Sequence, residues 1–328
     1  MFLIIFIVSL FAIVFLVPSL LFAVVWVIGR LCRYKIRYRP YLFSSLVLAV
    51  LLIVLMGWGY YYRLSFYNIN KVEFSHKDVP AGFDGYRIVH ISDLHLDGWK
   101  GHEEKLARIL CEIDSLQPDV VCFTGDLVSL SPDELTPFLG CLSRIEAKDG
   151  VFSVLGNHDY FPYRRNISDE EREERVRRLS AMQRDSLGWH LLLNENVKLR
   201  RGGDSISVMG CENQSVGFHS VVKRGDLMKT MEGADAKMKI LMTHDPTQWR
   251  KEVVGKTDIQ LTLSGHTHAL QMRVLGFTPS KWFYPECDGL YEEGKQSLYV
   301  NIGLGGTLPM RLGATPEITL ITLHHQGN

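Results

Sequence analysis

Polar side chains able to bind metal ions or move protons follow five short apolar segments of this 328-residue chain. Each group comes directly after a run rich in Val, Ile and Leu, and none contains Cys. The groups are Asp93 and His95; Asp126; Asn157, His158 and Asp159; His244; and His266 and His268. Carboxylate, amide and imidazole donors together suit a divalent ion of intermediate hardness, such as Mn, Fe or Zn. The lack of cysteine disfavours a closed structural zinc site.

The elements that would position these groups are strands. Apolar runs at 87–91, 120–124, 152–155, 240–243 and 259–263 precede the five groups, and further strands are expected at 206–209, 298–302 and 318–323. Helices are expected at 103–116, 133–145, 168–187, 221–231 and 246–254. Strands that alternate with helices indicate α/β architecture. Ligands of open α/β sheets bind beyond the carboxyl ends of strands, so we expect the five groups to converge at one edge.

Each group alone is weak evidence for a metal site. A single His after a strand is usually a hydrogen-bonded structural residue, and Gly-Asp is usually a turn. Asp93 and His95 are two positions apart, as are His266 and His268. Residues at this spacing point the same way if the segment is extended like a strand. Five groups at five strand ends favour a metal site over coincidental turn chemistry.

In this order the motifs resemble the signature of the calcineurin-like metallophosphoesterases. The resemblance rests on Asp93-x-His95, Gly125-Asp126, Gly156-Asn157-His158-Asp159, His244 and Gly265-His266-x-His268, and it spans roughly residues 86–323. Segments 83–88 and 301–318 resemble a membrane-anchored or exported bacterial branch, some of whose members are associated with cleavage of UDP-2,3-diacylglucosamine. Relatives often continue the last motif with Gly-Gly-Gln, whereas this chain has Ala-Leu-Gln at 269–271. Because of that difference, the resemblance does not define the substrate-side wall of the site.

The resemblance implies a four-layer fold in which two mixed β-sheets pack together with helices outside. It implies that Asp93, His95 and His268 hold one metal ion, and that Asn157, His244 and His266 hold a second. Asp126 would bridge both ions, and His158, oriented by Asp159, would act near the leaving group.

The predicted chemistry is hydrolysis of a phosphodiester, phosphomonoester or pyrophosphate. Two metal ions can clamp the attacking and leaving oxygens and lower the pKa of bound water, so hydroxide is expected to attack phosphorus. A serine nucleophile is not needed, and the chain has no Gly-x-Ser-x-Gly elbow. Arg311 is expected either to contact a substrate phosphate or to form a surface salt bridge.

Two uncharged apolar runs near the N-terminus predict transmembrane helices at about 2–28 and 41–60. The loop between them, 30–39, carries five positive charges and no negative charge. The positive-inside rule places this loop in the cytoplasm and everything after residue 62 outside it. Phospholipid or cell-wall phosphodiesters fit that location. A UDP-linked lipid substrate would require the opposite orientation.

We therefore expect a membrane anchor at 1–62, a linker and lead-in strand at 63–85, and a catalytic domain at 86–328. The expected partners are the lipid bilayer and a phosphoester, which can be lipid-linked. Lys plus Arg and Asp plus Glu are equal at 36 each, which gives no reason to expect a nucleic acid. Substrate specificity is assigned to loops 161–166 and 276–294, whose aromatic cluster at 282–284 either faces lipid or packs locally.

One alternative from another class is a non-catalytic, membrane-tethered scaffold that keeps the phosphoesterase fold. Its signature would be the loss of ligand residues, and no ligand position lacks a competent side chain. A channel or transporter is disfavoured because two spans without ionisable residues offer no polar pathway.

Overall fold

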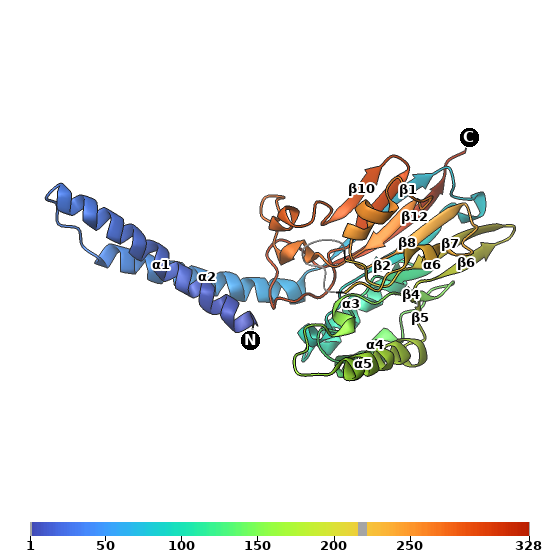
Figure 1. Ribbon diagram of the computed structural model, residues 1–328, viewed down its shortest axis with the longest axis horizontal. Helices are drawn as coiled ribbons and strands as arrows, with labels where there is room; N and C mark the ends of the chain where they lie inside the picture. The colour runs from blue at the N-terminus through green and yellow to red at the C-terminus, as the bar shows by residue number, and fades with distance from the viewer. Residues whose placement is uncertain (1, 216–221, 328) are drawn as a thin grey trace. The chain divides into compact units, whose positions relative to one another are not determined.

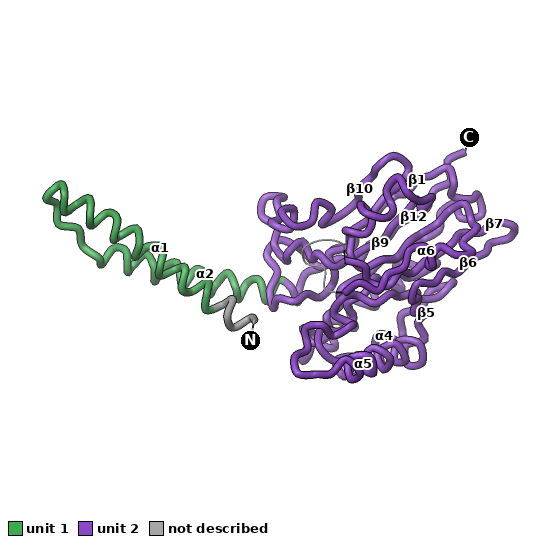
Figure 2. The backbone as a smooth tube through the Cα atoms, in the orientation of Figure 1, with its two compact units in different colours: residues 1–62 green, residues 63–328 purple. Residues whose placement is uncertain are grey.

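The computed structural model describes residues 2–215 and 222–327, with side chains from residue 8 onward. The chain divides into two compact units, Met1–Tyr62 and Arg63–Asn328 (Figure 2). The ribbon shows a helical first unit and a second unit built from sheets and helices (Figure 1).

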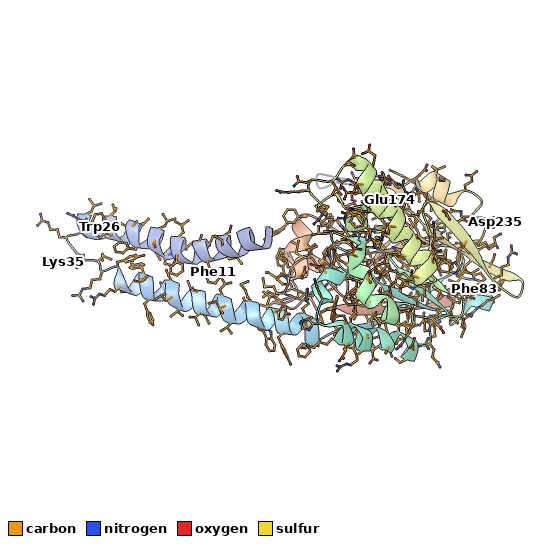
Figure 3. All side chains as sticks on the ribbon, turned by 90° about the horizontal axis from the view of Figure 1, so that it is seen from below. Phe11, Trp26, Lys35, Phe83, Glu174 and Asp235 are labelled. Carbon is orange, nitrogen blue, oxygen red and sulfur yellow. The ribbon has the colours of Figure 1, made fainter. Side chains whose placement is uncertain are left out.

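The first unit is a pair of helices joined by a short loop that carries Lys35 (Figure 3). Helix α1 spans Phe2–Leu31, and α2 spans Arg39–Ser65, its last turn belonging to the second unit. The ring of Phe22 packs edge-on against Tyr38 and Tyr41, with centroids 4.9 and 5.3 Å away. Both helices are long and apolar enough to cross a membrane, in agreement with the two predicted spans.

The second unit contains two six-stranded mixed sheets. The first sheet has the order β1 (Asn68–His76), β12 (Glu317–His325), β2 (Arg87–Ile91), β3 (Val120–Phe123), β4 (Val151–Ser153) and β5 (His190–Leu191). The second has the order β10 (Gly289–Glu293), β11 (Gln296–Val300), β9 (Leu261–Ser264), β8 (Met238–Met242), β7 (Asp204–Gly210) and β6 (Glu195–Arg201). Strands β2 to β5 are parallel, as are β7, β8, β9 and β11.

Alternating side chains place one core between the sheets and one on each outer face. In β8, for example, Ile240 lies in the core between the sheets and Leu241 lies in the core on the outer face. Helices α3 (Glu103–Ser115), α4 (Leu139–Leu142) and α5 (Asp169–Ala181) belong to the first sheet's outer layer, and α6 (Leu227–Met231) to that of the second. The predicted fold of two mixed sheets flanked by helices is therefore confirmed.

Several predicted elements differ from those observed. Residues 133–145 form a 3₁₀ segment, Pro132–Phe138, followed by the single turn of α4, because Pro137 removes a backbone donor within the segment. A π turn, Trp249–Val253, replaces most of the helix expected at 246–254. The helix expected at 221–231 is described only from residue 222, and α6 begins at Leu227. Strands β5, β6 and β10 were not predicted.

Strand register brings the polar segments together. Ile91 of β2 lies opposite Phe123 of β3, which lies opposite Ser153 of β4. In the second sheet, Met242 of β8 lies opposite Leu263 of β9. Each of the five predicted polar groups therefore follows the carboxyl end of a strand that has a parallel neighbour ending at the same level.

Candidate metal centre

The predicted ligands lie in tight turns beyond the strands. Five of them have positive φ angles: Asp93 (52°), His95 (44°), Asp126 (57°), His266 (75°) and His268 (50°). The left-handed region is unfavourable for residues with a Cβ atom. The two i,i+2 pairs therefore do not lie in extended segments, the condition under which their side chains were expected to point the same way.

Asp126 occupies the middle of the cluster. Its Oδ2 atom lies 3.4 Å from Nε2 of His95 and 3.2 Å from Nε2 of His244. Its Oδ1 atom accepts a hydrogen bond from the backbone N–H of His158 at 2.8 Å. All three side chains are buried, so one carboxylate joins two groups of imidazoles away from bulk water.

On one side of Asp126, three atoms able to bind a metal ion lie close to one another. Oδ1 of Asn157 lies 3.1 Å from Nε2 of His244 and 2.8 Å from Nδ1 of His266. The Nδ1–H of His244 donates to the carbonyl of Thr124 at 2.7 Å, which leaves the lone pair of this ring on Nε2. The amide of Asn157 donates to the hydroxyl of Tyr163 at 3.0 Å, which turns its oxygen toward the histidines.

On the other side, Asp93, His95 and His268 form a second group with the spacing of metal ligands. Oδ1 of Asp93 lies 3.9 Å from Nε2 of His95 and 3.5 Å from Nε2 of His268. Within the described chain, buried Nε2 of His95 has no hydrogen-bond partner. A buried polar atom without a partner is costly, so this nitrogen fits a metal ion that would complete its bonding.

Two glycines make the close approach of these turns feasible. A Cβ atom on Gly156 would lie 2.2 Å from Oδ1 of Asp126. A Cβ atom on Gly265 would lie 2.0 Å from Oγ of Ser92 and 2.2 Å from Oδ2 of Asp93. Any other residue at either position would displace a predicted ligand.

The electrostatics keep negative charge at the centre. Burial alone would raise the pKa of Asp126, but the imidazoles of His244 and His158 hold it well below its usual range. Burial alone would lower the pKa of His244, whereas the Asp126 carboxylate raises it to about 10. A buried carboxylate that stays ionised and attracts cationic groups is suited to a divalent ion.

The structure corrects the expected role of Asp159. Its carboxylate does not contact the His158 ring; it accepts hydrogen bonds from four backbone N–H groups, those of Gly156 (2.9 Å), Asp126 (2.9 Å), Leu127 (3.3 Å) and Val128 (3.1 Å). Asp159 therefore holds the turn that carries Asp126. The His158 ring is oriented by the carbonyl of Ser129, which accepts from Nδ1 at 3.1 Å.

The structure also corrects the expectation for Arg311. This side chain is fully buried, and its guanidinium donates to the carbonyls of Ile302 (2.7 Å), Gly303 (3.0 Å), Gly305 (2.6 Å) and Ala314 (3.1 Å). These bonds fix the segment after β11 in place. Arg311 neither lines the pocket nor forms a surface salt bridge within the described chain.

A pocket of about 200 Å³ opens over the cluster. Its polar wall contains five predicted site residues, and its remaining wall is made by tyrosines and loop residues. The lining residues are Asp126, Asn157, His158, Tyr163, His266, Thr267, His268, Leu270, Gln271, Tyr284, Thr307 and Leu308. Both loops to which specificity was assigned contribute, through Tyr163 and Tyr284.

Sequence reasoning missed the functions of these two tyrosines. The hydroxyl of Tyr284 lies 2.9 Å from Nε2 of His266, and that of Tyr163 contacts Asn157. Each tyrosine thus touches a predicted ligand and lines the pocket. Their positions in the two loops assigned to specificity were a signal, but no spacing pattern pointed to either hydroxyl.

Two facing mixed sheets, with carboxylates and histidines at the carboxyl ends of their strands, define the metallophosphoesterase fold. The profile of the calcineurin-like phosphoesterase family matches residues 86–270, and the chain belongs to this family. It is accordingly a hydrolase of phosphoester bonds, and its His and Asp clusters suit two metal ions.

Related proteins share most of the second unit. The chain is 30% identical over 277 residues to YkuE, an uncharacterized metallophosphoesterase of Bacillus subtilis, covering 81% of this chain and 90% of YkuE. It is 30% identical over 262 residues to a Danio rerio transmembrane protein with a metallophosphoesterase domain, covering 77% of this chain and 56% of that protein. A dimetal phosphatase from Danio rerio superposes with a TM-score of 0.42 at 12% identity, over 69% of this chain and 90% of that one.

Proposed function

We propose that this protein is a membrane-anchored phosphoesterase that uses two divalent metal ions. Asp93, His95 and His268 would hold one ion, and Asn157, His244 and His266 the other. Asp126 would bridge them. The observation that carries this proposal is the position of Oδ2 of Asp126, within 3.4 Å of both His95 and His244. Mn, Fe or Zn suits this mixture of oxygen and nitrogen donors.

Two bound ions would supply a water of lowered pKa and would stabilise negative charge on the phosphate oxygens. The protein's own groups prepare the site for this chemistry. Thr124 and Tyr163 fix the donor atoms of His244 and Asn157 before any ion binds, which reduces the reorganisation needed.

His158 is the residue we assign to the leaving-group side. It lines the pocket, and its Nδ1–H is held by the carbonyl of Ser129, so Nε2 is the atom able to exchange a proton with a ligand there. Burial lowers the pKa of His158 to about 4, so the ring by itself is neutral at pH 7.

The two apolar helices and the transmembrane relative support membrane anchoring. An anchored hydrolase meets substrates at the membrane, so we propose a lipid-linked phosphoester. A pyrophosphate such as UDP-2,3-diacylglucosamine is the candidate if the second unit faces the cytoplasm. Phospholipid or cell-wall phosphodiesters are the candidates if it faces outward, the orientation that the positively charged loop favours.

The test is Asp126→Asn in the full-length protein, with Asp114→Asn as the control. Asp114 is an exposed carboxylate on α3. We expect Asp126→Asn to lose at least 100-fold in hydrolysis of bis(p-nitrophenyl) phosphate and to hold less metal by elemental analysis, with unchanged circular dichroism. Retained turnover would refute the bridging role. A wild-type protein that holds no metal would favour the non-catalytic scaffold instead.

A further inference from the structure

Beside the pocket, the loop after β9 exposes apolar side chains. We call this surface the apolar rim; it consists of Leu270, Val274, Leu275, Phe277, Trp282 and Phe283. Leu275 is fully exposed, and 74% of Trp282 and 56% of Phe283 are exposed. Contiguous exposed apolar groups of this kind mark surfaces that contact another phase or partner.

The rim is held in this exposed conformation by its own hydrogen bonds. Val274 and Phe277 exchange backbone hydrogen bonds across a tight turn. The hydroxyl of Thr278 donates to the carbonyl of Ala269 at 2.6 Å, and the Trp282 ring packs on Phe277 with centroids 5.6 Å apart. The apolar side chains are therefore presented by an ordered scaffold.

The rim borders the pocket at both of its ends. Leu270, at its start, lines the pocket, and so does Tyr284, which directly follows Phe283. The hydroxyl of Tyr284 reaches His266. One continuous segment thus runs from the predicted metal ligands to the exposed apolar surface.

The composition of the rim fits the interface of a lipid bilayer. Between residues 273 and 284 there is no acidic residue, and the exposed Lys281 stands beside Trp282. Tryptophan and other aromatic rings favour the headgroup level of a bilayer, and nearby lysines favour anionic lipid surfaces.

The first residues of the second unit lie near a segment that carries a predicted ligand. Arg63 and Leu64, the unit's first residues, are buried, and Leu64 packs in its core. The Arg63 guanidinium donates to the carbonyl of Gly98, three residues after the predicted ligand His95, and lies over the ring of Trp99. α2 ends at Ser65 and β1 begins at Asn68, so two residues separate this helix from the first strand.

We propose that the apolar rim docks on the bilayer to which the protein is anchored and presents the pocket to phosphoesters carried by lipids. The rim enters the interfacial layer through Leu275 and Trp282. The docking stands on the exposure and composition of the rim, while its effect on catalysis rests on the proposed function.

The first test places a fluorophore on the rim of the full-length protein in phospholipid vesicles. The label is attached at Leu275→Cys, with Cys32, Cys111 and Cys141 replaced by Ser. The control label is at Met228→Cys, which is 79% exposed on α6. We expect quenching by spin-labelled lipids to be at least threefold stronger at 275 than at 228. Equal quenching at positions 275 and 228 would overturn the docking. Protection of the label at 275 in detergent, by a second copy of the chain or by another protein, would also overturn it.

The second test compares two substrates with the variant Leu275→Ser, Trp282→Ser, Phe283→Ser. We expect kcat/KM for a phosphodiester lipid in vesicles to fall at least tenfold, and that for soluble bis(p-nitrophenyl) phosphate to stay within twofold. An equal loss on both substrates, or none on the lipid, would overturn the presentation role. If the metal-loaded wild type hydrolyses neither substrate, the proposed function fails, and the quenching result alone decides whether the rim docks.

Discussion

Replacement of Arg311 by Met tests whether this arginine supports the fold or binds substrate. Its guanidinium donates to four carbonyls, those of Ile302, Gly303, Gly305 and Ala314, none of which belongs to a sheet. A methionine of similar length would fill the space but donate nothing. Four buried carbonyls would lose the partner that Arg311 supplies.

The cost follows from the hydrogen bonds lost and the charge removed. The carbonyl of Gly303 keeps the backbone N–H of Glu317 as a donor at 3.4 Å, so three carbonyls are left unpaired. Leaving a buried carbonyl unpaired costs about 2 kcal/mol, so three cost about 6 kcal/mol. Burial lowers the pKa of Arg311 from 12.5 to about 10, which means that removing the buried charge returns about 3 kcal/mol. The net loss is about 3 kcal/mol, at the lower end of measured losses when one partner of a buried charged pair is removed.

Thermal unfolding of the purified full-length protein measures this loss. We expect the melting temperature of Arg311→Met to fall by about 6 °C or more. Arg311→Lys, which keeps the charge and three donors, should recover about half of the loss. Arg108→Met, at an exposed arginine on α3, is the control and should leave it unchanged. A wild-type melting temperature combined with a raised KM would refute the structural role and return Arg311 to the substrate.

Three further results are expected. Burial raises the pKa of Glu317 from 4.5 to about 7, so between these values the unfolded state binds fewer protons than the folded state and stability falls as pH rises. Glu317→Gln should remove this fall in stability. Melting curves of the wild type and the variant at pH 5 and pH 8 measure it, and an equal shift in the melting temperature of both proteins would contradict the prediction. Gly265→Ala should displace Asp93 and lower the metal content by at least tenfold. The control is Gly140→Ala, whose added Cβ atom meets no atom within 4 Å, and it should leave the metal content unchanged. Equal metal content of the two variants in elemental analysis would count against the predicted ligand set. Paired reporters fused to the C-terminus should be active outside the cytoplasm; activity inside would overturn the positive-charge argument and make a UDP-linked lipid the leading substrate.

The central strands could be predicted because they are covered on both faces. β3, for example, is an unbroken buried run, which reads as apolar in the sequence. The edge strands carry no such signal. β6 has the sequence ENVKLRR, with one buried residue, and β10 has none, so both look like loops until the sheet supplies their partners. Pairing with a neighbour, rather than local composition, decides these elements.

The candidate site also has a part that the sequence predicted and a part that it did not. Residue type and strand-end position predicted which side chains gather around Asp126, since parallel strands end at one edge. They did not predict what Asp159 and Arg311 bind, because both use backbone groups as partners. Every residue offers such groups, so a backbone partner leaves no mark in the sequence.

The backbone conformation of the predicted ligands lowers the stability of the folded protein. Residues held at positive φ cost of order 1–3 kcal/mol each, and glycine would avoid this cost. Asp93 and His95 remain in that region, held by hydrogen bonds from their own backbone N–H groups to the carbonyls of Gly125 (2.9 Å) and Asp126 (3.1 Å). The turn after β2 is thereby fastened to the turn after β3. This fold holds both side chains in a strained conformation and leaves Nε2 of His95 without a hydrogen-bond partner inside the described chain. Such an arrangement is prepared for a ligand that bonds to both side chains.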